Sequence, residues 1–299
     1  MLKMYHQRAH KGDSPELWEE NWENNNLELA LRFCENDPLR PLFERYARPG
    51  TAMLEGGCGQ GHYVAYYADR GVRVVGLDFA QSTLARLRAR YEHLMLCAGD
   101  VAALPFSDEA FDLYYSGGVV EHFEDGAEPA LREARRVVRP DGILLISVPY
   151  LSPLRRTLSL TKRDWRQVSS SQKDVSNNGS SGTFFQYAYT ISEFSSILER
   201  CGLRVIELQP YSILWGLYDL PFLEKTLSRV GASQGPAAVS NIESEIAPTN
   251  NPKAGQSRLV NLARSMVINE NVDTPVTGLA VRFLRWASAN MMMYVCVRQ

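Results

Sequence analysis

The most constraining feature of this sequence is a regular alternation of short apolar runs and helix-like segments between Thr51 and Val148. The runs with the pattern of buried strands are TAMLEG, VRVVGLD, HLMLCAG, FDLYYSG and GILLISV. The segments between them place apolar residues at helical spacing, as Leu84 and Leu87 illustrate. Strands that alternate with helices in this way predict a parallel sheet that is covered by helices on both faces.

The later part of the chain predicts two further strands. Thr190-Ile-Ser-Glu193 has the form of a capping box, so we expect a helix to begin there and to end at Gly202. A strand is predicted from Leu203 to Leu208, directly after this helix. The last apolar run, Met291 to Val297, predicts a final strand.

Three segments fall outside this alternation and set the expected domain boundaries. Residues 1–49 are expected to form a helical lid, and residues 214–290 a helical insertion that caps the substrate. The main domain then comprises residues 50–213 and 291–299. The Ser/Asn/Gly-rich residues 167–182 predict a mobile loop within it. The helices expected in the insertion are Trp215–Val230, Ser257–Ile268 and Gly278–Ala289.

Composition and charge exclude several classes of protein. The chain has 299 residues, of which 45% are hydrophobic and 22% charged, which is typical of a globular protein. Its formal net charge of −2 gives no general attraction to nucleic acid or anionic membranes. The apolar runs are too short to span a bilayer. The five scattered cysteines favour neither a disulfide framework nor a metal site, so we expect a metal-free cytoplasmic protein without a transmembrane segment.

The segment Glu55-Gly-Gly-Cys-Gly-Gln-Gly61 predicts a ligand site at the end of the first strand. A glycine turn that leads into a helix exposes main-chain N–H groups to a ligand. The spacing differs from the dinucleotide pattern G-x-G-x-x-G, because the third glycine comes one residue early and His62 follows it. Glu55 would repel a pyrophosphate and suits a ligand that carries an ammonium group. Asp78, at the end of the second strand, can accept hydrogen bonds from ribose hydroxyls.

These features and the motifs that follow resemble class I S-adenosylmethionine-dependent methyltransferases, of the type 11 or 25 methyltransferase domain. The matching motifs in order are LEGGCGQG, GLDFA, GDVAALPF, FDLYYSGGVVEHF and RPDGILLISVP. The resemblance implies an α/β fold: a doubly wound, Rossmann-like, seven-stranded, mostly parallel sheet with an antiparallel last strand, plus helical N-terminal and C-terminal insertions. It also implies S-adenosylmethionine as the cofactor and S-adenosylhomocysteine as the product.

The resemblance further implies roles for individual cofactor-site residues. The main chain around the glycine turn would approach the methionine portion, with Glu55 near its amino group. Cys58 is better explained as a small buried side chain in this turn than as a nucleophile. Asp78 would bind the ribose, and Asp100 the adenine edge. The cofactor-binding residues expected in full are Glu55, Gly57, Cys58, Gly59, Gly61, Asp78, Phe79, Asp100, Val101, Ser116 and Gly117.

On the substrate side, His122 is the candidate catalytic residue, because it follows the fourth strand and can take a proton from an attacking hydroxyl or amine. The alternative is that His122 only shapes the pocket. Tyr150, Tyr187 and Tyr189 are candidates for the substrate pocket, or else pack over the sheet. Trp18 and Trp22 are expected on a lid helix above the cofactor.

The sequence therefore predicts a methyltransferase that acts on an oxygen, nitrogen or carbon nucleophile of a small molecule, as in biosynthetic or secondary metabolism. An RNA or protein methyltransferase is the first alternative, since basic residues flank Trp165, although nucleic acid is not the favoured partner. A non-catalytic module that binds the cofactor is the second. The acceptor, the use of a general base, the role of the insertion and the oligomeric state, including a homo-oligomer, stay open.

Overall fold

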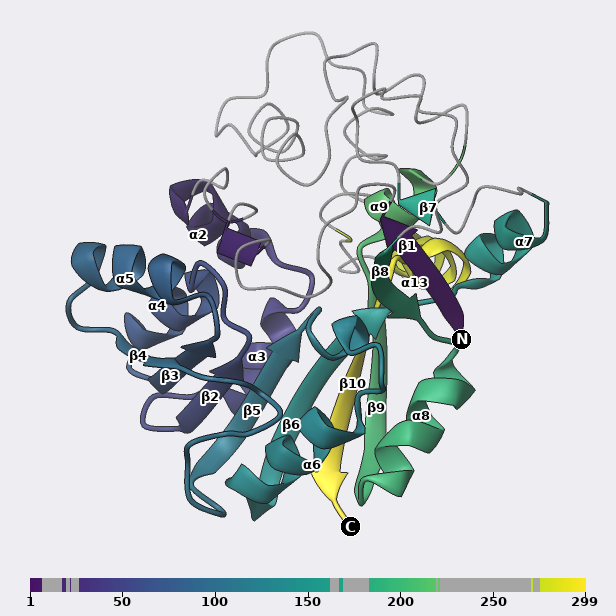
Figure 1. Ribbon diagram of the computed structural model, residues 1–299. Coiled ribbons are helices and arrows are strands. Elements are labelled where there is room, and N and C mark those ends of the chain that lie inside the picture. The colour runs from purple at the N-terminus through teal and green to yellow at the C-terminus, as the bar shows by residue number, and fades with distance from the viewer. Residues whose placement is uncertain are drawn as a thin grey trace, which may run out of the picture.

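The fold is organised around a seven-stranded sheet with strand order β4-β3-β2-β5-β6-β10-β9 (Figure 1). The computed structural model describes residues 1–6, 18–19, 22, 27–161, 167–168, 183–218, 220, 270 and 275–299. In chain order the sheet strands are β2 (Ala52–Gly56), β3 (Arg73–Asp78), β4 (Met95–Ala98), β5 (Phe111–Gly117), β6 (Val138–Pro149), β9 (Leu203–Tyr211) and β10 (Met291–Arg298). The pairings among β2 to β6 are parallel, whereas β10 is antiparallel to both β6 and β9. The predicted fold class is confirmed, including the antiparallel last strand.

Helices cover both faces of this sheet, and neighbouring strand residues show why. Met53, Leu113 and Leu145 belong to one buried cluster, while the residues that follow them, Leu54, Tyr114 and Ile146, belong to the other. This alternation follows from the two-residue repeat of a strand, which turns successive side chains to opposite faces. The first cluster also takes in side chains from α3 (Arg40–Tyr46), α4 (His62–Ala68) and α5 (Gln81–Arg90); the second takes in side chains from α6 (Glu128–Val137) and α8 (Ile191–Arg200).

The strand order reverses between β2 and β5, and this reversal places the site. From β2 the chain builds outward to β3 and β4, and it then returns to the other side of β2 with β5 and β6. In open α/β sheets the crevice for a ligand lies at such a switch point, beyond the carboxyl ends of the strands. In Figure 1 these ends point upward, away from the C-terminus of the chain.

The beginning of the chain differs from the expected helical segment. Leu2–His6 is a strand, β1, which pairs antiparallel with β8 (Thr183–Ala188) and parallel with β7 (Gln167–Val168) in a second, three-stranded sheet. A short strand whose partner lies far away in the chain leaves no local signal, which explains the difference. Helical residues appear further along: residues 18, 19 and 22 are helical, and α2 spans Leu27–Asn36.

The insertion is described only at its two ends. α9 (Ile213–Tyr218) overlaps the start of the first expected helix, and α13 (Pro275–Ser288) confirms the third. Residues 257–268 lie outside the described residues, as do 169–182 of the expected loop. The apolar stripe on α13 is exposed, with Leu279 at 69%, Phe283 at 62% and Trp286 at 54%. The opposite face of α13 is covered by its neighbours, since Val281 and Ser288 are buried.

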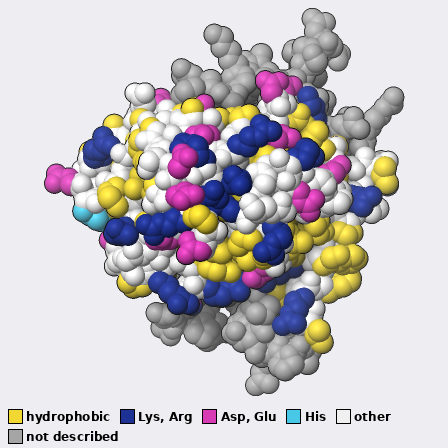
Figure 2. All heavy atoms as spheres, turned by 90° about the horizontal axis from the view of Figure 1, so that it is seen from below, with side chains coloured by type: hydrophobic (Ala, Val, Ile, Leu, Met, Phe, Trp, Pro, Cys, Tyr) yellow, Lys and Arg dark blue, Asp and Glu magenta, His cyan; other side chains and the backbone are white. Residues whose placement is uncertain are grey.

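The basic segment near Trp165 is described only at its start, in α7 (Pro153–Thr161). Arg155 is buried, and its guanidinium donates to the carbonyl oxygens of Tyr150 and Asn290 at 2.9 and 3.2 Å. This arginine therefore joins α7 to the chain before β10 and is not part of a solvated basic face. Figure 2 shows the side at the amino ends of the parallel strands, where Lys and Arg are interspersed with Asp and Glu.

The start of α8 gives a direct test of the capping prediction. The Thr190 hydroxyl accepts a hydrogen bond from the Glu193 N–H, and the Glu193 carboxylate accepts one from the Thr190 N–H, so the predicted capping box is confirmed. We expect Thr190→Ala to lower the free energy of unfolding by about 1 kcal/mol, because a helix-end N–H loses its acceptor. Urea denaturation measures this change. Ser196→Ala, an exposed position within the same helix, is the control and should change it by less than about 0.5 kcal/mol.

Candidate functional site

A cavity of about 540 Å³ lies at the carboxyl ends of β2 to β5. Its walls come from the turns that follow these strands, from the 3₁₀ helix η1 (Val120–His122), from β8 and from the N-terminal segment. The lining residues are Trp18, Trp22, Glu55, Gly57, Cys58, His62, Tyr63, Asp78, Phe79, Gly99, Asp100, Val101, Tyr115, Gly117, Gly118, Val119, His122, Phe123, Glu124 and Phe184. A volume of this size suits a small-molecule or cofactor site.

The glycine turn lets the main chain approach both the cavity and neighbouring side chains. Gly57 has φ +77°, and a Cβ on it would stand 2.4 Å from a Val119 methyl group. Gly61 has φ +70°, and its Cβ would stand 2.2 Å from a Leu87 methyl group on α5. An L-residue at either position would be both strained and crowded. Both glycines are therefore required by the backbone conformation and by packing, and Gly57 also lines the cavity.

The Asp78 carboxylate holds the shape of this turn. One of its oxygens accepts a hydrogen bond from the Gly59 N–H at 2.7 Å, and the other from the Ala80 N–H at 2.9 Å. Burial raises the pKa of Asp78, while these main-chain donors oppose the rise. Each carboxylate oxygen has two lone pairs, so the same group can also accept a bond from a ligand in the cavity.

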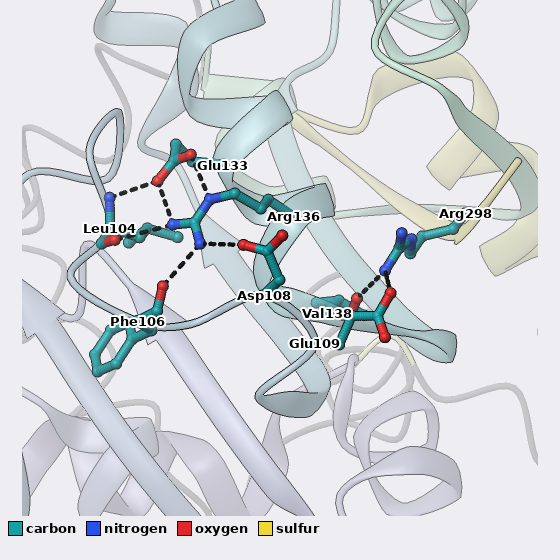
Figure 3. A network of polar contacts seen from close by, with 8 residues as sticks. All are labelled: Leu104, Phe106, Asp108, Glu109, Glu133, Arg136, Val138 and Arg298. Carbon is teal, nitrogen blue, oxygen red and sulfur yellow. Dashed lines mark hydrogen bonds and ion pairs between the residues drawn. The ribbon is translucent and has the colours of Figure 1, made fainter.

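The loop after β4 brings Asp100 and Val101 to the cavity, and a partly exposed arginine network fixes the base of this loop (Figure 3). Arg136 of α6 donates to the carbonyl oxygens of Leu104 and Phe106 at 3.0 and 2.8 Å. It also pairs with Glu133, whose carboxylate accepts from the Leu104 N–H at 2.8 Å. The loop is thus tied to α6 a few residues beyond the cavity wall.

Glu55 is the most perturbed acid of the site. Its side chain is 4% exposed, and one carboxylate oxygen is buried without a hydrogen-bond partner. Burial and the nearby charge of Asp78 raise its pKa well above the usual range. An unpaired carboxyl group of this kind gains stability when a cationic ligand group arrives. Cys58, by contrast, stays a thiol, because burial raises its pKa well above its ordinary value.

His122 lies where η1, β8 and the N-terminal segment meet. Its Nδ1 donates to the carbonyl oxygen of Phe185 at 2.7 Å, since a carbonyl can only accept. The neutral ring therefore carries its proton on Nδ1 and presents Nε2 as the basic nitrogen. The Trp18 ring lies edge-on to the His122 ring at a centroid distance of 4.8 Å. Ring packing and the hydrogen bond to Phe185 thus fix the orientation of this imidazole at the cavity wall.

Most of the residues that the sequence singles out come together in this cavity. Those that line it are His122, Glu55, Gly57, Cys58, Asp78, Phe79, Asp100, Val101, Gly117, Trp18 and Trp22. Ser116 does not line the cavity and is buried. Gly59 does not line it either, because it lies against the Trp22 ring: a Cβ on Gly59 would stand 2.6 Å from an atom of that ring. Tyr150, Tyr187 and Tyr189 are buried in aromatic packing around β8 and also lie outside the lining.

Sequence analysis missed several lining residues, notably Tyr63, Tyr115, Phe123, Glu124 and Phe184. Tyr63 and Tyr115 stand close to the recognised motifs, so their position next to a glycine turn and at a strand end was an available signal. Phe184 comes from a strand that the local pattern did not reveal.

Among the described residues, no helix has the length and hydropathy that a membrane crossing needs.

Comparisons with known proteins agree with this geometry. Residues 54–146 match a family model described as a methyltransferase domain. A Mycolicibacterium smegmatis protein named "Probable S-adenosylmethionine-dependent methyltransferase" is 40% identical over 110 residues, which are 36% of this chain and 42% of that protein. The malonyl-[acyl-carrier protein] O-methyltransferase of Serratia marcescens is 39% identical over 103 residues, 34% of this chain and 39% of the relative. The chain thus spans about two fifths of the length of these relatives.

A solved structure extends the likeness to the fold of the whole chain. It is a complex between the Haloferax volcanii Trm112 methyltransferase activator and a methyltransferase, with a TM-score of 0.52 at 15% identity. The match covers 97% of this chain and 99% of that one, and at this identity it shows the fold alone. Residues 54–146 therefore form a class I S-adenosylmethionine-dependent methyltransferase domain, as the motifs predict. The cofactor of this class is S-adenosylmethionine.

The raised pKa of Glu55 predicts how stability depends on pH. Above about pH 4.5, the ordinary pKa, unfolded Glu55 loses its proton while folded Glu55 keeps it, so the folded state binds more protons. The free energy of unfolding therefore falls as pH rises, until the pH reaches the raised pKa. Relative to Glu55→Gln, we expect the wild type to lose up to about 1.4 kcal/mol per pH unit in this window. Parallel curves in urea denaturation from pH 5 to 8 would contradict this.

Proposed function

We propose that this protein is an S-adenosylmethionine-dependent methyltransferase that acts on a small-molecule acceptor. The observation that carries the proposal is one cavity that joins the glycine turn, Asp78, Asp100 and the oriented His122. When bound, S-adenosylmethionine supplies an electrophilic methyl group on a sulfonium sulfur. The buried, unpartnered carboxylate oxygen of Glu55 and the main chain of Gly57, which lines the cavity, fit such a cofactor.

The cofactor and the acceptor would bind at different parts of the sheet edge. On the β2 to β4 side, Glu55 would face the ammonium group, Asp78 the ribose and Asp100 with Val101 the adenine, with Phe79 packed against the ring. On the β5 side, Gly117, η1 and β8 would hold the acceptor. Trp18 and Trp22 of the N-terminal segment would close the cavity and exclude water, so orientation and desolvation would supply most of the rate gain.

His122 would act as the general base for acceptors that lose a proton. Its Nδ1 is committed to the Phe185 carbonyl, so Nε2 is the nitrogen that can take the proton from a hydroxyl or amine. The O-methyltransferase name of the Serratia relative supports an oxygen acceptor. The malonyl acceptor in that name does not transfer to this chain, because the match spans less than half of that protein.

Binding of the cofactor is the first test. We expect wild-type protein to bind S-adenosylhomocysteine in isothermal titration calorimetry, and Asp78→Ala to weaken binding by about 10- to 100-fold, since a charged acceptor and the support of the glycine turn are both lost. Asp69→Ala is the control, because Asp69 is exposed and lies outside the cavity lining. Unchanged binding by Asp78→Ala, or no binding by the wild type, would refute the proposal.

The role of His122 is tested by methyl transfer itself. We expect labelled methyl groups to move from S-adenosylmethionine to members of a panel of small alcohols, phenols and amines. For the best acceptor, His122→Asn should lower the rate by about 10²- to 10⁴-fold and remove the dependence of the rate on a basic group, while S-adenosylhomocysteine still binds. An unchanged rate and pH profile would assign His122 to shaping the pocket. Transfer to RNA alone, with salt-sensitive binding, would favour a macromolecule methyltransferase instead.

A further inference from the structure

The charges around the cavity point to the kind of acceptor that it holds. Four carboxylates line it, from Glu55, Asp78, Asp100 and Glu124, whereas no lysine or arginine does so among the residues that the structure describes. In the proposed arrangement the first three face the cofactor. Glu124 is the lining acid on the acceptor side, two residues after η1. An anionic acceptor group would therefore meet a described lining that contains a carboxylate and no cationic side chain, which is costly.

Aromatic rings make up most of the acceptor side. Phe123, Phe184 and Trp18 line it together with the His122 ring. Flat apolar groups pack well between such rings, and cations are attracted to their faces. The protein itself uses this attraction: the Lys3 ammonium lies 5.5 Å from the centroid of the Phe184 ring.

Lys3 does not line the cavity, whereas Glu124 does. The Lys3 ammonium lies 3.2 Å from one carboxylate oxygen of Glu124, so the two charges form an ion pair with the carboxylate on the cavity side. The Glu124 side chain keeps 57% of its surface exposed and can also face an incoming molecule. Its neighbour Asp125 is exposed too but does not line the cavity.

We propose that the acceptor side of this cavity selects a flat, uncharged or cationic small molecule and rejects carboxylates and phosphates, and that Glu124 sets this preference. The proposal rests on the proposed function, because it takes the β2 to β4 side of the cavity as the cofactor side. It makes Glu124 a specificity residue that touches the acceptor and leaves cofactor binding to other groups.

The experiment compares three probes of nearly equal size and different charge: benzylamine, which is a cation at pH 7.5, neutral benzyl alcohol and anionic benzoate. Each is titrated into protein saturated with S-adenosylhomocysteine, and ligand-observed NMR gives its apparent Kd. We expect benzylamine and benzyl alcohol to bind at least about tenfold more tightly than benzoate. Glu124→Lys should shift the ratio of benzylamine to benzoate affinity by at least about tenfold toward benzoate. Asp125→Lys, which makes the same change of charge outside the lining, should shift it by less than about twofold.

The outcomes separate this inference from the proposed function. Failure of wild-type protein to bind S-adenosylhomocysteine in calorimetry would overturn the proposed function. If that ligand binds, benzoate binding as tightly as benzylamine would overturn the charge preference alone. Binding of none of the probes would overturn the aromatic wall as an acceptor site. If Glu124→Lys and Asp125→Lys shift the ratio of benzylamine to benzoate affinity equally, Glu124 is not the residue that sets the charge preference.

Discussion

The arrangement depends on one buried carboxylate that joins two strand ends. Asp78 ends β3, yet its oxygens accept from main-chain N–H groups both in the glycine turn after β2 and at the start of α5. These bonds compensate for the cost of burying the acid and hold the turn open toward the cavity. A turn rich in glycine would otherwise sample many conformations, because glycine is the least restricted residue. The same side chain therefore gives the site its shape and one of its polar groups.

The topology separates two kinds of task across the switch point. On one side, the turns after β2, β3 and β4 present acids and bare main chain; on the other, β5, η1 and β8 present rings and one oriented imidazole. The residues that hold these groups in place lie behind the cavity lining. Arg136 ties the loop of Asp100 to α6, and Phe185 fixes the His122 ring, although neither residue lines the cavity. Binding groups and the contacts that hold them in place thus belong to different elements.

The central sheet and the cofactor side were predictable because their signals are local. A buried strand, a glycine turn and the acid at the next strand end occupy short stretches of sequence, and their order alone places them at one edge of the sheet. The capping box at Thr190 was predictable for the same reason. The acceptor side was harder, because Phe184 reaches the cavity through pairing of β8 with β1, across more than half of the chain. Glu124 resembles any exposed acid until η1 is placed beside that sheet.

The tyrosines show a second limit of sequence analysis. Tyr150 and Tyr189 directly follow β6 and β8, and Tyr187 lies within β8, but all three are buried in the same cluster as Phe194. The periodicity of apolar residues indicates that a side chain is buried, but it does not show which part of the chain packs against it. α13 shows the converse, since Leu279, Phe283 and Trp286 recur at helical spacing and are nevertheless exposed.

The place of β10 in the sheet has a consequence for synthesis on the ribosome. β9 touches the main sheet only through β10, yet β10 is the last of these strands to be made, some eighty residues after β9. While the chain emerges, β6 stays at the border of a five-stranded sheet, with its unpaired N–H and C=O groups open to any extended peptide nearby. Arrival of Met291–Arg298 covers that border and recruits β9 in the same event. Nascent chains stalled before this strand should therefore be the form most in need of a chaperone.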